Sequence, residues 1–409
     1  MMNSERLMNK EFEKRRRLLT KLIGKDGIAV IPTSDTRVRS RDTDYPYRPG
    51  SDFYYFTGFS EPNAVMILAP GREDGAFVLC LRQKDPLTEI WDGHTEGLNG
   101  VKKNFGADQS FKIEDLETTL SSLFMGRQKV FFTLGQDEVL DKVLMKSFNS
   151  VRAGQRRGGV VPSEIQALEP LIHEMRLIKS KHEIALMRKS ANISVDAHKR
   201  VFKNCKPGVF EYQIEADIIH EFGKNGSVPA YTSIVASGEN ACTLHYISNR
   251  EEMKAGQLLL TDAGSEYEMY AADITRTIPV SGTYSKEQKE IYELVLEVQK
   301  TAIENVKPGQ TFEGLQSGAI KGLTQGLKKL GLLKGQIDQL IKSEAYKDFY
   351  TDNEFGASWY LTDLYSKEIV SEDINVANIK SFDINAMLAG FWLRRYIHNT
   401  SDEIYTILE

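Results

Sequence analysis

Two aspartates in LLLTDAGSEYEMYAADITRT, from Leu258 to Thr277, have a type and spacing that could do chemistry. Asp262 and Asp273 lie in a segment that predicts one strand, a tight turn and a returning strand. Because cross-strand partners share a face, the two carboxylates can lie side by side. Two carboxylates that close raise each other's pKa unless a cation neutralises them. Hard oxygen ligands favour Mn²⁺ or Mg²⁺, so the pattern suggests a metal site.

A histidine upstream points the same way, because TLHYISN predicts His245 in an apolar strand after YTSIVASGENACT. An ordinary structural interpretation stays open on spacing alone. In that interpretation Asp262 and Asp273 are turn and strand-edge residues, and His245 is a satisfied core imidazole.

The composition bounds the class of protein. A chain of 409 residues predicts two or more domains, and 41% hydrophobic with 27% charged residues is typical of a soluble globular protein. A net charge of −5 argues against nucleic acid and anionic membranes as partners. No run is apolar enough for a signal peptide or a membrane span, and the three cysteines lack CxxC spacing. We therefore expect a reduced, cytoplasmic protein.

The first part of the chain predicts a small α/β domain over about residues 26–150. GIAVIP, AVMILAP, AFVLCL and KVFFTL read as buried strands with helices between them. RAGQRRGGVV at 152–161 is expected to be a solvated linker loop, and His94 a loop residue without a metal role. A helix at ALEPLIHEMRLIKS then leads to a boundary near Lys179–Ser180, which predicts domains at 1–178 and 179–409.

The second domain contains an internal repeat. Ser180 and Glu183 form the capping-box pattern of a helix that ends before Lys206-Pro207-Gly208, and FEYQIEADIIHEF follows as a second helix. About one hundred residues on, Ser285 and Gln288 open a similar helix, Lys307-Pro308-Gly309 stops it, and FEGLQSGAIKGLTQGLKKL follows. The repeat predicts a pseudo-twofold body in which each half contributes strands and ligands to a shared sheet.

The block YTSIVASGENACTLHY, followed by LLLTDAGSEYEMYAADITRTIPVSGTYSKEQKEIYELVLE, closely resembles Xaa-Pro aminopeptidases (aminopeptidase P), which are pita-bread metallopeptidases. RSRDTDYPYRPGSDFYYFTGFSEPNAV at 39–65 resembles the same family's first domain. The resemblance covers about residues 8 to 350. It implies an α/β N-terminal domain that supports oligomerisation as a dimer or tetramer, and an α+β pita-bread domain with pseudo-twofold duplicated halves.

The resemblance also implies a site and a substrate. Asp262 and Asp273 match metal-binding aspartates, and His245 matches a histidine that lines the substrate site. The family holds two ions, usually Mn²⁺, and releases the N-terminal residue of peptides with proline at the second position. A glutamate ligand of the family usually acts as proton shuttle.

Three of the five expected metal ligands, one histidine and two glutamates, are missing. The histidine segment reads FYTDNEFGASWYLTDLY, with Asn353, Ala357 and Leu364 or Tyr365 in place of histidines, and the whole chain has no histidine between His245 and His398. SFDINAMLAG lacks the first glutamate, and GFWLRRYIHN offers Arg395 or Tyr396 in place of the second.

Four acidic residues of the tail are alternative ligands, although nothing in their spacing singles them out: Glu354, Asp363, Glu372 and Asp383. The divergence begins abruptly near Thr351, whereas the first half of the site is complete. We interpret the tail, 351–409, as replaced through a frame change or a recombination event.

Three functions follow from these observations. One is an Xaa-Pro aminopeptidase with an incomplete manganese site that binds metal weakly or in part. A second is a catalytically inactive pita-bread protein that binds peptides or proteins. A third is a partner subunit of an intact paralogue.

Overall fold

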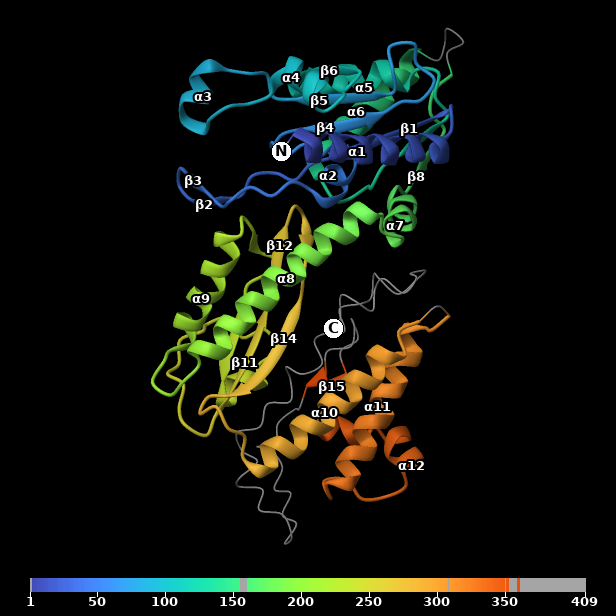
Figure 1. Cartoon of the computed structure of the whole chain (residues 1–409). Coiled ribbons are helices and arrows are strands. Elements are labelled where there is room, and N and C mark those ends of the chain that lie inside the picture. The colour runs from blue at the N-terminus through green and yellow to red at the C-terminus, as the bar shows by residue number, and fades with distance from the viewer. Residues whose placement is uncertain (1, 155–159, 308, 350, 353–358, 361–409) are drawn as a thin grey trace. The chain divides into compact units, whose positions relative to one another are not determined.

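The computed structural model describes residues 2–154, 160–307, 309–349, 351–352 and 359–360. Contacts divide the chain into two compact units, Met1–Arg176 and Leu177–Glu409 (Figure 1). This division falls two residues before the expected boundary at 178. Within the described ranges, no helix is both long and apolar enough to cross a bilayer.

The first unit is built on a six-stranded mixed sheet in the order β6-β5-β4-β1-β7-β8. Its strands are β1 (Gly27–Pro32), β4 (Val65–Leu68), β5 (Phe77–Leu81), β6 (Gln109–Lys112), β7 (Lys129–Phe131) and β8 (Glu164–Gln166). A separate ribbon pairs β2 (Val38–Ser40) with β3 (Thr43–Asp44). The helices are α1 (Met2–Ile23), α2 (Ser51–Thr57), α3 (Pro86–Asp92), α4 (Gly97–Asn104), α5 (Leu116–Phe124), α6 (Glu138–Gly154) and α7 (Glu169–Leu177).

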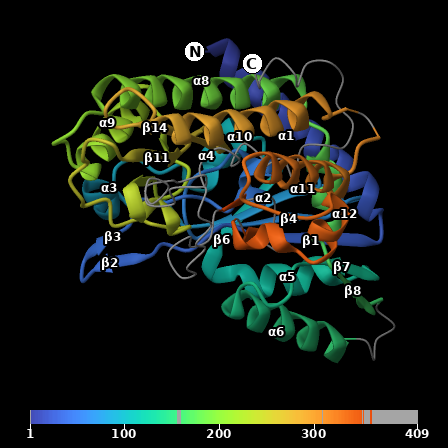
Figure 2. The same ribbon diagram turned by 90° about the horizontal axis from the view of Figure 1, so that it is seen from below.

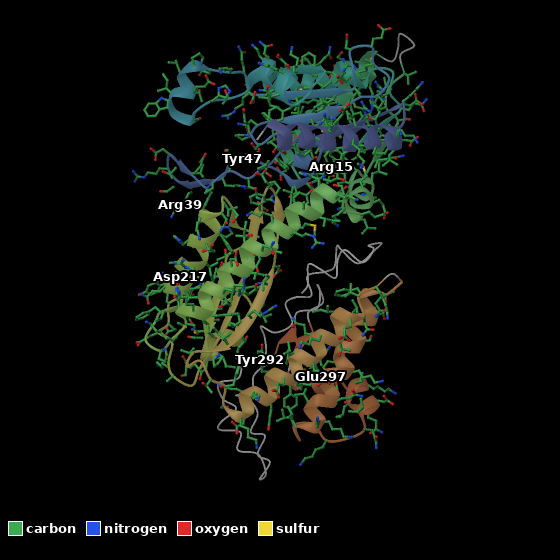
Figure 3. The ribbon with its side chains drawn as sticks, in the orientation of Figure 1. Arg15, Arg39, Tyr47, Asp217, Tyr292 and Glu297 are labelled. Carbon is green, nitrogen blue, oxygen red and sulfur yellow. The ribbon has the colours of Figure 1, made fainter. Side chains whose placement is uncertain are left out.

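Helices cover both faces of this sheet, with α1 and α2 on one face and α5 and α6 on the other (Figures 1 and 2). The alternation along β1 explains the three layers, because successive strand side chains point to opposite faces. Ala29 and Ile31 pack in one core, and Ile28 and Val30 pack in the other. Arg15 on α1 (Figure 3) donates to the Tyr55 carbonyl oxygen at 3.0 Å, which ties α1 to the last turn of α2.

The four strands predicted for this unit are confirmed as β1, β4, β5 and β7. The predicted loop at 152–161 is only partly correct. Arg152 to Gly154 complete the last turn of α6, and 155–159 lie outside the described residues.

The first half of the second unit carries the sheet β10-β11-β14. Its elements are α8 (Lys181–Asn204), α9 (Glu211–Lys224), β9 (Val228–Pro229), β10 (Ile234–Ser237), β11 (Leu258–Ala263), β12 (Ser265–Tyr267), β13 (Tyr270–Ala271) and β14 (Ile274–Pro279). A second small sheet has the order β13-β12-β9.

Helices α8 and α9 cover one face of the β10-β11-β14 sheet (Figure 1). Their shared core contains Val201, Ile218 and Phe222 against Val235 and Leu259. The helices are also tied by Asp217 of α9 (Figure 3), which accepts from Arg200 Nε at 2.7 Å and from Asn204 Nδ2 at 2.6 Å. The opposite face of the sheet is thereby left for Asp262.

The second half contains α10 (Lys286–Glu304), α11 (Phe312–Lys329) and α12 (Ile337–Lys342), followed by β15 (Thr351–Asp352) and β16 (Trp359–Tyr360). Tyr292 lies on α10 (Figure 3), and its ring packs against that of Tyr284 with centroids 4.9 Å apart. Leu258 of β11 joins the core between these helices, so the two halves share apolar contacts.

The helical repeat is present as predicted, and both α8 and α10 begin with a complete capping box at Ser180 and Ser285. One detail differs from the expectation. Helix α10 ends at Glu304, before Lys307, because Asn305 caps it with its side-chain amide on the Thr301 carbonyl oxygen at 2.7 Å. The sheet segments expected from the second half fall outside the described residues, apart from β15 and β16.

Burial of His198 between α8 and β11 makes stability depend on pH. Its exposed fraction is 3%, and Nε2 donates to the Ala263 carbonyl oxygen at 3.2 Å. Burial lowers the pKa of His198 to about 4, from an ordinary value of 6.5. The unfolded chain therefore binds a proton between these two pH values that the folded chain excludes.

We predict that the stabilisation tied to neutral His198 is complete above pH 6.5 and is lost as the pH falls towards 4. The loss approaches about 3 kcal/mol of unfolding free energy, by the linkage between pKa and stability. Urea unfolding between pH 4.5 and 7.5 measures it as the unfolding free energy of the wild type minus that of His198→Gln, a difference that should fall as the pH falls. Exposed His220 on α9 supplies the control, because His220→Gln should parallel the wild type. Parallel curves for His198→Gln would contradict the prediction.

Candidate metal and substrate site

The hairpin that carries the two aspartates is longer than predicted. Chain reversal occurs at Glu268 and Met269, both with positive φ, and Tyr267 pairs with Tyr270 across them. The predicted tight turn directly after LLLTDAG is therefore wrong. The chain continues past Gly264 into β12 before it turns. A two-residue turn whose residues both have positive φ matches the twist of a hairpin.

The register places the carboxylates on one face, as expected. Asp262 lies opposite Thr275 in the β11–β14 ladder, and Asp273 lies two residues before Thr275. Asp262 and Asp273 are thus diagonal neighbours across the hairpin, a relation that keeps long side chains within reach. Ile234 of β10 pairs with Asp262 on the other side.

Gly264 allows the returning strand to approach. A Cβ added there would lie 1.8 Å from the Ala272 carbonyl oxygen and 3.1 Å from Asp273 Cα. No side chain fits that gap, and backbone atoms cannot move aside as a flexible side chain can. Gly264 is therefore the residue that lets Asp273 lie beside Asp262.

Tyr231 bridges the two carboxylates. Its hydroxyl lies 2.5 Å from Asp262 Oδ1 and 3.0 Å from Asp273 Oδ1. A phenol has one proton to donate, so it cannot satisfy two ionised carboxylates at once. The remaining negative charge requires a proton or a cation.

The pKa shifts express the same requirement. Burial, and then the neighbouring charge of Asp262, raise the pKa of Asp273 to about 7. Burial also raises the pKa of Asp262, although the hydrogen bond from Tyr231 and the charge of His245 act in the opposite direction. Burial and both carboxylates raise the pKa of Tyr231 well above its ordinary value, so it stays a donor.

His245 does not lie in a strand, and that prediction is wrong. It is an exposed residue in a turn after a short 3-10 helix at Gly238–Cys242, where the Tyr246 amide donates to the Thr243 carbonyl oxygen at 3.2 Å. The side chains of 243–248 mix polar and apolar residues with no sheet partner, so periodicity misled the prediction. The structure nevertheless brings His245 close enough for its charge to act on Asp262.

The described residues fit one divalent cation and not two. Carboxylate oxygens of Asp262 and Asp273 converge under the Tyr231 hydroxyl, and hard cations complete such a shell with water. Among the described residues no group of three His, Cys, Asp or Glu side chains converges for a metal. The tail residues weighed above as missing or substitute ligands, from Asn353 to Tyr396, all lie outside the described residues.

His94 belongs to the first unit, whereas the two aspartates belong to the second. Its Nδ1 is 3.3 Å from Lys84 Nζ and 3.5 Å from Glu89 Oε1. This cluster comes from α3 and the loops on either side of it, and it is consistent with the expected role of His94 as a loop residue. Sequence reasoning missed Tyr231 and Gly264. Tyr231 opens the quoted block YTSIVASGEN, but only the tertiary contact reveals its partners.

Gly264→Ala should push the backbone at Ala272 and Asp273 away from β11, and so lower affinity for Mn²⁺ at least tenfold. Isothermal titration with Mn²⁺ and thermal unfolding with and without the ion measure the effect. Gly223→Ala is the matched control, because it lies in α9 with nothing within 4 Å of an added Cβ. It should bind like the wild type and gain up to about 1 kcal/mol in stability. Equal affinity for both variants would contradict the account of Gly264.

Tyr231→Phe should destabilise the chelator-treated protein by about 1–3 kcal/mol, because it removes a hydrogen bond to a desolvated carboxylate pair. Urea unfolding gives the free energy. Tyr212→Phe on α9 changes an exposed hydroxyl and should have no measurable effect. If Tyr231→Phe loses as little unfolding free energy as Tyr212→Phe, the Asp262–Asp273 pair does not need the phenol.

Comparison with known proteins identifies two domains in this chain. The sequence pattern of the aminopeptidase P N-terminal domain matches residues 12–132, and that of metallopeptidase family M24 matches 185–352. The second match stops where the tail was predicted to diverge. The Xaa-Pro aminopeptidase of Escherichia coli is 37% identical over 369 residues, 90% of this chain and 83% of its own length.

Solved structures agree. Aminopeptidase PepP of Pseudomonas aeruginosa superposes with a TM-score of 0.82 and 45% identity, covering 84% of this chain and 78% of that one. A zinc-substituted E. coli aminopeptidase P in complex with product has a TM-score of 0.82 and 37% identity, covering 86% and 80%. The chain therefore belongs to the Xaa-Pro aminopeptidases of metallopeptidase family M24, with an α/β first domain and a pita-bread second domain of duplicated halves.

Proposed function

We propose that this protein is a divalent-metal-dependent Xaa-Pro aminopeptidase that acts on peptides with proline at the second position. The observation that carries the proposal is the half-buried Asp262–Asp273 pair under Tyr231, in a chain that covers most of its relatives' length. We propose Mn²⁺ as the metal, since carboxylate ligands favour hard ions.

In this proposal each residue has a stated role. Asp262 and Asp273 hold the cation, and Tyr231 orients Asp262 by donating its hydroxyl proton. His245, exposed beside the pair, donates a hydrogen bond to the carbonyl oxygen of the bound peptide. A bound divalent cation supplies a water of lowered pKa and polarises a carbonyl.

The number of bound metal ions determines the rate of peptide hydrolysis that we expect. With two carboxylates the site holds one ion, and the family's second ion has no described ligand beyond them. The family's proton-shuttle glutamate is also missing from its expected position in the sequence. We therefore propose hydrolysis well below the rate of a chain with the full ligand set.

A non-catalytic peptide-binding protein is the second candidate, alone or as the partner of an intact paralogue. The favouring observation is the absence of any histidine between His245 and His398 in the sequence, together with a family match that stops at 352.

The proposal extends to assembly and location. We propose a homo-oligomer, dimer or tetramer, joined through the 1–178 domain. Support comes from α3, where Leu87, Ile90 and Trp91 are exposed at 71%, 76% and 87%, because exposed apolar patches often mark interfaces. A cytoplasmic location is supported by three free cysteines.

An Xaa-Pro peptide assay in excess Mn²⁺ tests the activity, with elemental analysis of bound metal. We expect about one ion per chain and slow turnover that Asp273→Ala abolishes. Glu221→Gln on α9, outside the site, should keep the wild-type rate. No turnover with retained peptide binding would favour the second candidate. Two bound ions per chain would contradict the ligand set described above.

A further inference from the structure

Glu211 is a fully buried carboxylate at the first position of α9, with an exposed fraction of 0%. Its Oε1 accepts from the Ser237 amide at 2.7 Å, Ser237 Oγ at 2.8 Å and Asn240 Nδ2 at 3.0 Å. Its Oε2 accepts from Tyr246 OH at 2.8 Å and the Glu251 amide at 3.0 Å. Five donors thus converge on one side chain.

Such a cluster matches the acceptor capacity of a carboxylate. Both oxygens accept and neither donates, and the start of a helix favours negative charge. Burial of an ion is costly unless hydrogen bonds replace its water, and here every donor is within 3.0 Å. The side chain of Glu211 is consequently held in place by five hydrogen bonds.

All five donors come from 237–251, the segment that carries His245. Ser237 and Asn240 lie on the outgoing side of that segment, and Tyr246 and Glu251 lie on the returning side. The backbone at Glu211 closes the arrangement, because its own amide donates to the Glu251 carbonyl oxygen at 3.0 Å. One carboxylate therefore fixes both ends of the loop.

Asn249 supports the returning side. It is buried with positive φ, accepts from the Val235 amide at 3.0 Å and donates to the Ser233 carbonyl oxygen at 3.0 Å. These bonds tie the loop back to β10, whose Ile234 pairs with Asp262. The loop is thus positioned relative to the strand that carries the metal-site aspartate.

We propose that Glu211 is the positioning residue that holds the 237–251 loop so that His245 faces the Asp262–Asp273 pair and meets the peptide there. The part that concerns peptide contact rests on the proposed function. The part that concerns loop order does not.

Glu211→Gln tests the proposal, because the amide keeps the shape but turns one acceptor into a donor that faces other donors. Glu183→Gln is the matched control. Glu183 is also buried near a helix start, and it accepts from the Ser180 amide and from Tyr270 OH, both at 2.8 Å. The control should therefore loosen Ser180 and leave the loop unchanged.

Hydrogen exchange of individual amides gives the first readout on chelator-treated full-length protein. In Glu211→Gln the Ser237 and Glu251 amides should exchange at least about tenfold faster, the size of one lost hydrogen bond. In Glu183→Gln they should keep wild-type protection. Unchanged protection of both amides in Glu211→Gln would overturn the proposal. If that variant fails to fold, Tyr246→Phe removes one donor to Glu211 together with the acceptor of Asn240 Nδ2, and it should loosen 243–248.

Affinity for Ala-Pro-Ala in Mn²⁺ gives the second readout, through a double-mutant cycle. Glu211→Gln and His245→Ala should each weaken binding about tenfold, and the double variant should bind no more weakly than His245→Ala. Additive losses would show that Glu211 acts elsewhere than through His245. If the wild type binds no such peptide, the proposed function fails, and amide exchange still decides the role of Glu211 in the loop.

Discussion

The structure of the second unit depends on two half-buried carboxylates, Asp262 and Asp273, brought onto one face of a hairpin. Their mutual repulsion is the cost of the arrangement, and Tyr231 with its single proton offsets only part of it. The rest of the local fold accommodates this pair. Gly264 lets the strands approach, and α8 and α9 bury the opposite face of the sheet so that only one face is left for chemistry.

Around that pair the first half of the site is rigid. Glu211 joins both sides of the loop that bears His245, and the buried amide of Asn249 ties that loop to β10. A site held in place by buried hydrogen bonds needs little reorganisation when a ligand arrives. This rigidity would serve peptide binding even where the rate of hydrolysis is low, and it links the two candidate functions.

Much of the fold could be predicted from the sequence. Four strands of the first unit, the capping boxes at Ser180 and Ser285, and the helical repeat follow from local patterns of apolar and capping residues. The turn after LLLTDAG and the strand around His245 could not be predicted, because their backbone is set by partners distant in sequence. Tyr267 pairs with Tyr270 beyond the expected turn, and Glu211 captures the loop from another helix.

The sequence by itself determined the lineage, the aspartate pair and the lack of a histidine between His245 and His398, since these depend on residue identity and order alone. Only the tertiary structure decided how the two carboxylates are positioned and how their negative charge is compensated. The phenol of Tyr231, the missing side chain of Gly264 and the carboxylate of Glu211 act through contacts across 31, 8 and 26 positions respectively. Such contacts leave no periodic signal, because their energy comes from burial and geometry that exist only once the chain has folded.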